Sequence, residues 1–180
     1  MLKINVHTER WEIYMNGSKA QNKNGFTIIE VVLVLAIAAL IFLMVFIALP
    51  ALQRNQRDTQ RKDDIGRTLT AVNNYQSNNR GKLPHQGTGS GSDTEKWNEF
   101  GEKYLKSADG EFEDPSEGEP YAFIVRTDTV QPNSDNNRGE IFVNADATCG
   151  DDGDVNTNAG TRKVALRIAL EGGGVYCQSN

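Results

Sequence analysis

The stretch that decides the fold is Lys23-Asn24-Gly25-Phe26-Thr27-Ile28-Ile29-Glu30, which is followed by an unbroken apolar run from Val31 to Leu49. Between Phe26 and Leu49, only Thr27 and Glu30 have polar side chains. A helix needs roughly 20 apolar residues to cross a bilayer, and this run nearly supplies them. Because a carboxylate inside lipid is costly and tends to be functional, Glu30 is predicted to have a specific partner.

The apolar run predicts a single-pass membrane helix rather than a secretory signal peptide. A signal peptide has an apolar core of about 7–15 residues near the N-terminus, closed by small residues at a cleavage site. In this chain a long polar stretch precedes the run, and no such site follows Leu49. The positive-inside rule does not decide the orientation, because basic residues flank the run on both sides.

The order of these elements resembles the N-terminus of type IV pilins and the related pseudopilins. In that family, a membrane-bound prepilin peptidase cleaves a polar, basic leader after a glycine and methylates the new N-terminal amine. The matching residues are Gly25 at the end of the leader, Phe26 as the first and N-methylated residue, and Glu30 as the fifth residue of the processed chain. The resemblance is close from Lys23 to about Leu49 and general beyond it.

The resemblance implies an assembly role for Glu30. Cleavage would give Phe26 a free ammonium group, and in a filament the Glu30 carboxylate of one subunit would meet that ammonium on a neighbour. An ion in a medium of low dielectric is stabilised mainly by a close opposite charge. The alternative is that Glu30, one turn from the helix start, reaches headgroup water and is favoured there by the helix dipole.

The expected fold class is α+β, with a long N-terminal helix packed on a small C-terminal antiparallel sheet. Three segments follow from this: a leader, a transmembrane or filament-core helix, and an extracellular head that contains an amphipathic helix, a connecting region with a short helix, and the sheet. Their expected bounds are 1–25 for the leader, 26–50 for the core helix and 51–180 for the head, which divides into 51–78, 79–120 and 121–180.

Pro50 is expected to break or kink the first helix, because proline removes a backbone donor. Beyond it, Ile65, Leu69 and Val72 recur at helical spacing and predict an apolar stripe that packs on the sheet. A short helix is expected from about Asp93 to Lys106, capped by Ser92 or Asp93. Strands are expected at 121–125, 140–143, 162–170 and 175–177, the last two joined by a glycine turn.

The two cysteines, Cys149 and Cys177, are expected to form a disulfide, since the head is exported and pilins commonly close a C-terminal loop in this way. Two unpaired buried thiols are the alternative. Between them, Asp152, Asp154 and Asn156 alternate like the opening of a calcium loop. The glycine and the bidentate glutamate of that loop are missing, so we expect a polar surface loop and no cofactor, with calcium as the weaker alternative.

The acidic composition argues against sequence-independent nucleic-acid binding by the head. The net charge is −5, and residues 1–25 carry four Lys or Arg and two Asp or Glu. Their removal leaves 15 basic against 22 acidic residues, or −7. No nucleophile, base and orienting group stand in a catalytic pattern, and no phosphate loop or dinucleotide motif is present, so we expect no enzyme.

We therefore expect a pilin that is stored as a single-pass precursor in the inner or cytoplasmic membrane, with its leader in the cytoplasm, and that then enters an extracellular surface filament for adhesion, twitching motility or DNA uptake. The expected partners are other pilin subunits, prepilin peptidase, a membrane platform with an assembly ATPase, the lipid bilayer, and a host or surface receptor or DNA. Two alternatives remain: a pseudopilin of a type II secretion or competence system, and an anchored extracellular binding domain that never polymerises.

Overall fold

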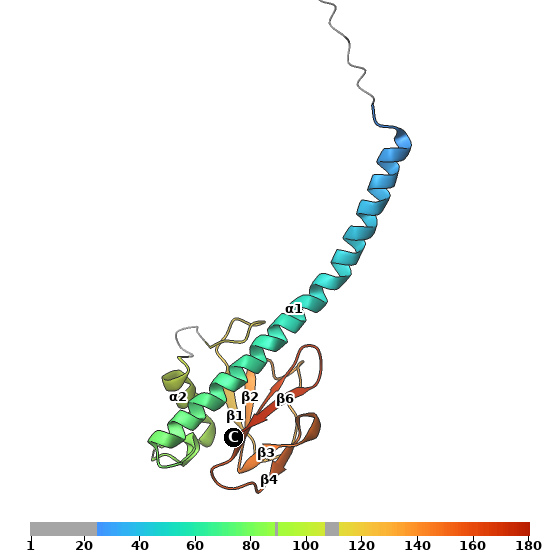
Figure 1. Ribbon diagram of the computed structural model, residues 1–180. Helices are drawn as coiled ribbons and strands as arrows, with labels where there is room; N and C mark the ends of the chain where they lie inside the picture. Colours follow the sequence, from blue (N-terminus) through green and yellow to red (C-terminus); the bar gives the residue numbers. More distant parts are fainter. Residues whose placement is uncertain (1–24, 89, 107–111) are drawn as a thin grey trace, which may run out of the picture. The chain divides into compact units, whose positions relative to one another are not determined.

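The computed structural model describes residues 25–88, 90–106 and 112–180 (Figure 1). The expected leader lies outside the described residues except for Gly25. The chain divides into two compact units, residues 1–43 and 44–180. The order of the elements is a long helix, a short helix and six short strands, which confirms the α+β class.

Helix α1 (Ile28–Asn78) runs through Pro50 without interruption. The expected helix break at Pro50 is therefore not present. An interior proline removes one backbone hydrogen bond and crowds the carbonyl of the residue four positions earlier, here Phe46. Apolar helices tolerate that loss when the neighbouring turns stay hydrogen-bonded, and α1 continues for about eight turns beyond Pro50, at about 3.6 residues per turn.

The core of the head lies between α1 and one face of a four-stranded sheet. The expected stripe is confirmed, since Ile65, Leu69 and Val72 are buried against strand residues such as Val143 and Leu166. Polar residues of α1 are also buried beside this stripe: Asp58, Arg61, Asp64 and Thr68. The face of α1 that meets the rest of the head is thus apolar at its centre and charged toward residue 58.

The sheet has the strand order β1-β2-β5-β6, and its strands are β1 (Ala122–Val125), β2 (Glu140–Ala145), β5 (Val164–Ala169) and β6 (Val175–Ser179). The expectation of a fully antiparallel sheet is wrong at one edge, because β1 pairs parallel with β2, Phe123 opposite Ile141. Parallel neighbours need a connection of a dozen or more residues, and residues 126–139 provide it. The β2–β5 and β5–β6 pairs are antiparallel.

A second, two-stranded sheet was not predicted. It pairs β3 (Ala147–Cys149) with β4 (Val155–Thr157) and packs on the outer face of β5, where Ala147, Val155 and Ala165 form a small buried cluster. Strands of three residues are too short to show an alternating pattern in the sequence.

Helix α2 (Asp93–Tyr104) is close to its expected bounds and starts with a capping box. Ser92 Oγ accepts from the Glu95 N–H at 3.3 Å, and Glu95 Oε2 accepts from the Ser92 N–H at 2.7 Å. The helix buries Trp97 and Phe100 against α1 residues and β1 residue Phe123.

Candidate processing and assembly segment

The start of α1 is held by a capping box between Thr27 and Glu30. Glu30 Oε2 accepts from the Thr27 backbone N–H and from Thr27 Oγ1, both at 2.8 Å, and Thr27 Oγ1 accepts from the Glu30 N–H at 3.3 Å. A threonine at the N-cap and a glutamate three residues later satisfy backbone donors that a helix start leaves without partners. The carboxylate that the sequence marked as functional therefore also fixes where the helix begins.

The chain just before this cap is open to a processing enzyme. Gly25 and Phe26 precede the helix in a segment that is neither helix nor strand, and Phe26 is 90% exposed. An added Cβ on Gly25 would meet no atom within 4 Å. Phe26 also lines an open hollow along the helix together with Glu30, Val31, Val34 and Leu35. The Glu30 carboxylate thus faces a hollow whose other walls are apolar.

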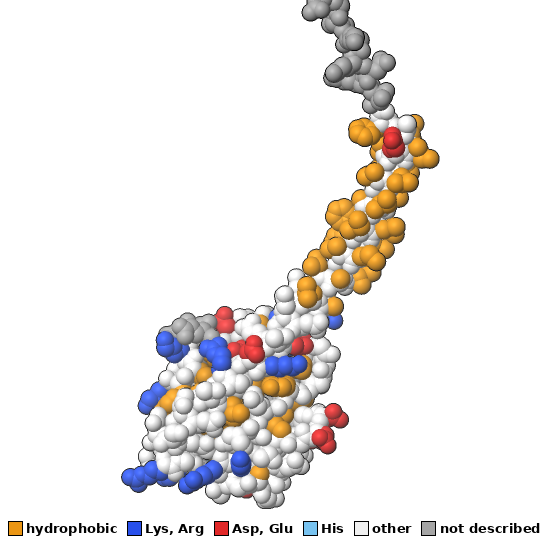
Figure 2. Space-filling view, viewed as in Figure 1, with side chains coloured by type: hydrophobic (Ala, Val, Ile, Leu, Met, Phe, Trp, Pro, Cys, Tyr) orange, Lys and Arg blue, Asp and Glu red, His pale blue; other side chains and the backbone are white. Residues whose placement is uncertain are grey.

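The apolar run from Val31 to Leu49 presents an uncovered surface in the described part of the chain. Its large side chains are all exposed, and Figure 2 shows hydrophobic side chains along the N-terminal part of α1 on the face in view. The helix is long and apolar enough to cross a membrane, and none of the most apolar stretch is buried. Soluble monomers rarely expose apolar patches of this extent, so the run requires lipid or other helices around it.

Comparison with known proteins addresses this same segment. Residues 20–46 match the family model described as the prokaryotic N-terminal methylation motif. The chain carries the type IV prepilin and pseudopilin signature. The motif implies a structural subunit that prepilin peptidase processes and that assembles with like subunits. Comparisons with curated proteins and with solved structures found no match. The motif itself ends at residue 46 and does not extend into the head.

Within the head, the charges buried under α1 form an ion network that sequence reasoning missed. Arg61 contacts the Asp114 carboxylate through two bonds, Nε to Oδ2 at 2.8 Å and Nη2 to Oδ1 at 3.0 Å. Burial alone would raise the pKa of Asp114, but the hydrogen bonds from Arg61 and from the Ser116 N–H hold it below its usual value. Asp114 is therefore anchored to α1 through Arg61.

Glu171, in the turn between β5 and β6, joins the same network. Its carboxylate contacts Arg57 Nη2 at 2.6 Å and Arg61 Nη2 at 3.1 Å, and it accepts a hydrogen bond from the Ser116 hydroxyl. Asp58 accepts from the Glu171 N–H and the Gly172 N–H, both at 2.8 Å. The hydrogen bonds from Arg57 are the main cause that lowers the pKa of Glu171 to about 2.

Tyr121, just before β1, provides a second polar link to α1. Its hydroxyl donates to Asp64 Oδ2 at 3.1 Å, one turn of α1 after Arg61. The pKa values of both groups are raised, chiefly because both are buried. In the sequence, Asp58, Arg61 and Asp64 follow one another at spacings of three, and no local pattern shows that the rest of the head covers them.

The structure joins Cys149 and Cys177 in a disulfide between β3 and β6, and it leaves no other cysteine in the chain. The suggested calcium ligands lie between them. Asp154 Oδ1 accepts from Gln131 Nε2 at 2.7 Å, and Asn156 lies on β4 with its side chain exposed. In the described residues, no three acidic, histidine or cysteine side chains are gathered as a metal site.

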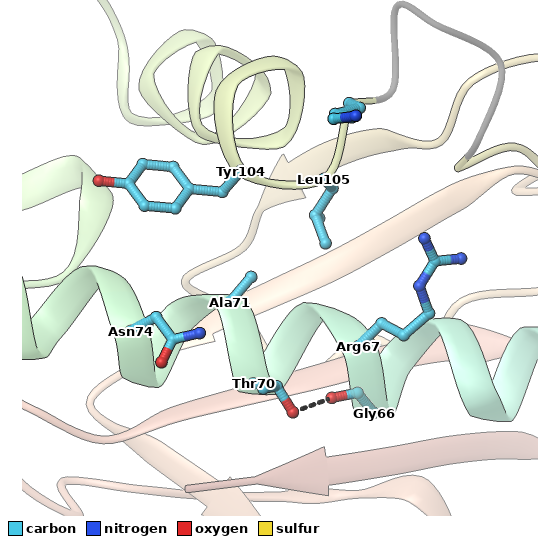
Figure 3. Close-up of a pocket in the computed structure, with 8 residues that line it drawn as sticks. Gly66, Arg67, Thr70, Ala71, Asn74, Tyr104 and Leu105 are labelled. Carbon is cyan, nitrogen blue, oxygen red and sulfur yellow. Dashed lines mark hydrogen bonds between the residues drawn. The ribbon is translucent and has the colours of Figure 1, made fainter.

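An open hollow in the head lies between α1 and the end of α2 (Figure 3). Its walls come from residues such as Thr70, Ala71 and Tyr104, and Thr70 Oγ1 donates to the Gly66 carbonyl at 2.9 Å. None of the residues lining it is an acid, a histidine or a cysteine.

Proposed function

We propose that this chain is the precursor of a type IV pilus subunit. In this proposal, residues 1–25 are the leader, residues 26–50 anchor the precursor and later form the filament core, and residues 51–180 form the exported head. Prepilin peptidase cleaves after Gly25 and methylates the amine of Phe26. The structural subunit then serves adhesion, twitching motility or DNA uptake.

The observation that carries the proposal is the coincidence of the methylation motif with an exposed apolar helix. The motif spans residues 20–46, and the side chains that follow Glu30 within it are apolar and unpartnered in the described part of the chain. A precursor in the membrane would bury this surface in lipid, and a filament would bury it among neighbouring helices. Lipid and a helix bundle are interchangeable for such a surface, because both are apolar.

The two oxygens of the Glu30 carboxylate support the move of the helix from lipid into a filament core. Oε2 takes both hydrogen bonds of the capping box, and among the described residues no bond falls on Oε1. One carboxylate can therefore cap its own helix and still accept the Phe26 ammonium of a neighbouring subunit. The pairing would neutralise both charges in the apolar filament core.

Mass spectrometry of the chain extracted from membranes and from sheared surface material tests the proposal. The expected product begins at N-methylated Phe26 and is abundant in the surface fraction. A chain that keeps Met1 in both fractions would contradict processing. A processed chain confined to the membrane would instead favour a pseudopilin of a secretion or competence system, which forms a short, non-adhesive filament.

A further inference from the structure

The head carries a cationic patch at the C-terminal end of α1, which we call the tip patch: Arg80, Lys82, Arg162 and Lys163. All four are exposed. The chain has no acidic residue at 65–92 or at 155–170, although it has 24 acidic residues in all. Figure 2 shows Lys and Arg side chains along the margin of the head near the end of α1.

Two segments far apart in the sequence build the tip patch, and several contacts hold them together. Gln76 Nε2 donates to the Arg162 carbonyl at 2.7 Å, and Gln86 Nε2 donates to the Thr161 carbonyl at 2.9 Å. The Arg162 guanidinium lies on the backbone of Gly81, where an added Cβ would come within 2.8 Å of it. The helix dipole favours a cation such as Arg80 after the last turn of α1, but it does not account for Arg162 and Lys163.

An acidic feature stands elsewhere on the head, on the short turn that precedes β4. We call this the acidic turn: Asp151, Asp152 and Asp154, all exposed. Three links hold the turn in place. Gln131 Nε2 donates to the Asp152 carbonyl and to Asp154 Oδ1, and the Cys149–Cys177 disulfide joins the strand just before the turn to β6. Gly153 has φ +80°, and a Cβ there would come within 2.6 Å of Val175.

The tip patch and the acidic turn form no ion pair within the described part of the chain, although Lys163 Nζ donates to the Asn180 main-chain oxygen at 2.8 Å and Asp154 Oδ1 accepts from Gln131. The ion pairs there involve other residues, such as Arg57, Arg61 and Arg126, and none includes a member of the tip patch or of the acidic turn. Unpaired charges of opposite sign on different parts of one surface are complementary between copies. A contact between two different patches is heterologous, so it repeats from copy to copy and builds an open polymer wherever its rotation does not close into a ring.

We infer that the tip patch of one head docks on the acidic turn of a neighbouring copy of this chain. The inference rests on the proposed filament and adds a contact between heads to the packing of the apolar helices. Charge pairs at such a rim are individually weak and are screened by salt. They set the register and partner choice of neighbouring heads more than the total affinity. The hydrogen bonds from Gln131 and the nearby disulfide fix the position of the acidic turn on its own head, so a neighbour would meet these charges in one place.

Charge reversal with rescue tests the inference in cells that assemble the full chain. The tip variant is Lys82→Glu with Arg162→Glu, and the turn variant is Asp151→Lys with Asp154→Lys. Each alone should lower filament mass in the sheared fraction about tenfold, because two attractive pairs become repulsive. The chain that combines both variants should recover most of the wild-type yield. Lys103→Glu, at an exposed position on α2, is the control for charge reversal elsewhere on the head and should leave the yield unchanged.

The outcomes separate this contact from the filament itself. A combined variant as poor as the single ones, or single variants with full yield, would overturn the head contact while wild-type filaments still support the proposed function. A wild-type chain that is processed but never polymerises would overturn both. If the tip variant keeps full filament yield but loses binding to DNA, the tip patch serves a polyanion and not a second copy. Levels of processed chain in the membrane serve as the folding control throughout.

Discussion

Arg61 and Asp114 form a two-bond ion pair that is shut off from solvent, with side chains 1% and 0% exposed. The pair joins the middle of α1 to a loop 53 residues later in the chain. Each partner has further contacts: Arg61 with Asp58 and Glu171, and Asp114 with the backbone N–H of Ser116. A buried ion pair is strongly destabilising to break, because one charge is then left without compensation.

Replacing Arg61 should therefore weaken the head far more than replacing an exposed arginine. Arg61→Met keeps much of the side-chain volume but leaves Asp114 as a buried carboxylate without its cation, which should cost about 3–5 kcal/mol of unfolding free energy. The measurement is urea unfolding of the detergent-solubilised full chain, followed by the fluorescence of buried Trp97. Arg54→Met, at an exposed position of the same helix, is the control. Equal midpoints for the two variants would show that the pair is not needed for stability.

The unfolding free energy of the head should fall in acid, because Glu171 becomes protonated. Its pKa is about 2 in the folded head, mainly because Arg57 hydrogen-bonds the carboxylate, against an ordinary value of 4.5. A depressed pKa stabilises the folded state fully above the ordinary value, and that contribution is lost as the pH falls from about 4.5 toward about 2. Asp114, whose pKa is also lowered, acts in the same direction.

Glu171→Gln isolates this contribution. The variant should be less stable than the wild type at neutral pH and should lose less stability between pH 5 and pH 2, because Gln cannot titrate. Urea midpoints measured across this range give the comparison, with the exposed Glu102→Gln as a control. Parallel pH profiles for the wild type and Glu171→Gln would rule out Glu171 as the source of the acid sensitivity.

The sequence alone predicted the elements that depend on local patterns. The apolar run, the stripe at Ile65, Leu69 and Val72, and the capped helix at Asp93 all follow a helical period or a cap signature. The Thr27–Glu30 capping box was also readable, since Thr-x-x-Glu before an apolar run is a known helix start. The parallel β1–β2 edge and the Arg61–Asp114 pair depend on which distant segments meet, and no local pattern encodes that.

Two substitutions of Glu30 should separate capping from charge. Gln keeps an acceptor for Thr27 and so keeps the capping box, whereas Val loses both the acceptor and the charge. If the Phe26 ammonium of a neighbour needs the carboxylate, both variants should insert into the membrane and neither should give filaments. The yield of sheared filaments and the membrane level of the chain are the two measurements. Normal filaments from Glu30→Gln would show that the hydrogen-bonding role suffices.

The disulfide should contribute to stability through the unfolded chain. Cys149 and Cys177 are 28 residues apart, and closing a loop of that length restricts the unfolded ensemble by about 3 kcal/mol. The double variant Cys149→Ser with Cys177→Ser should lower the urea midpoint accordingly. Reduction of the wild type should give the same loss, which controls for local effects of the serines. A double variant as stable as the oxidised wild type would mean that β3 and β6 hold together without the bond.

Two helical glycines should respond in opposite ways to alanine. A Cβ on Gly101 would lie 2.6 Å from Phe123 Cε2, and Phe123 is fully buried among aromatic side chains. Gly101→Ala must therefore displace a core ring, which should cost about 1–3 kcal/mol despite the better helix propensity of alanine. At Gly66 the nearest atom to a Cβ is Gln178 Oε1 at 3.7 Å, an ordinary contact. Gly66→Ala should accordingly gain up to about 1 kcal/mol.

Urea unfolding of the two variants under the same conditions makes this comparison direct, because both replace a helical glycine by the same residue. The expected signs are opposite, and the difference reports how tightly α2 lies on β1. If Gly101→Ala were as stable as Gly66→Ala, the ring of Phe123 would have room to move, and α2 would be less closely packed on the sheet than the 2.6 Å approach requires.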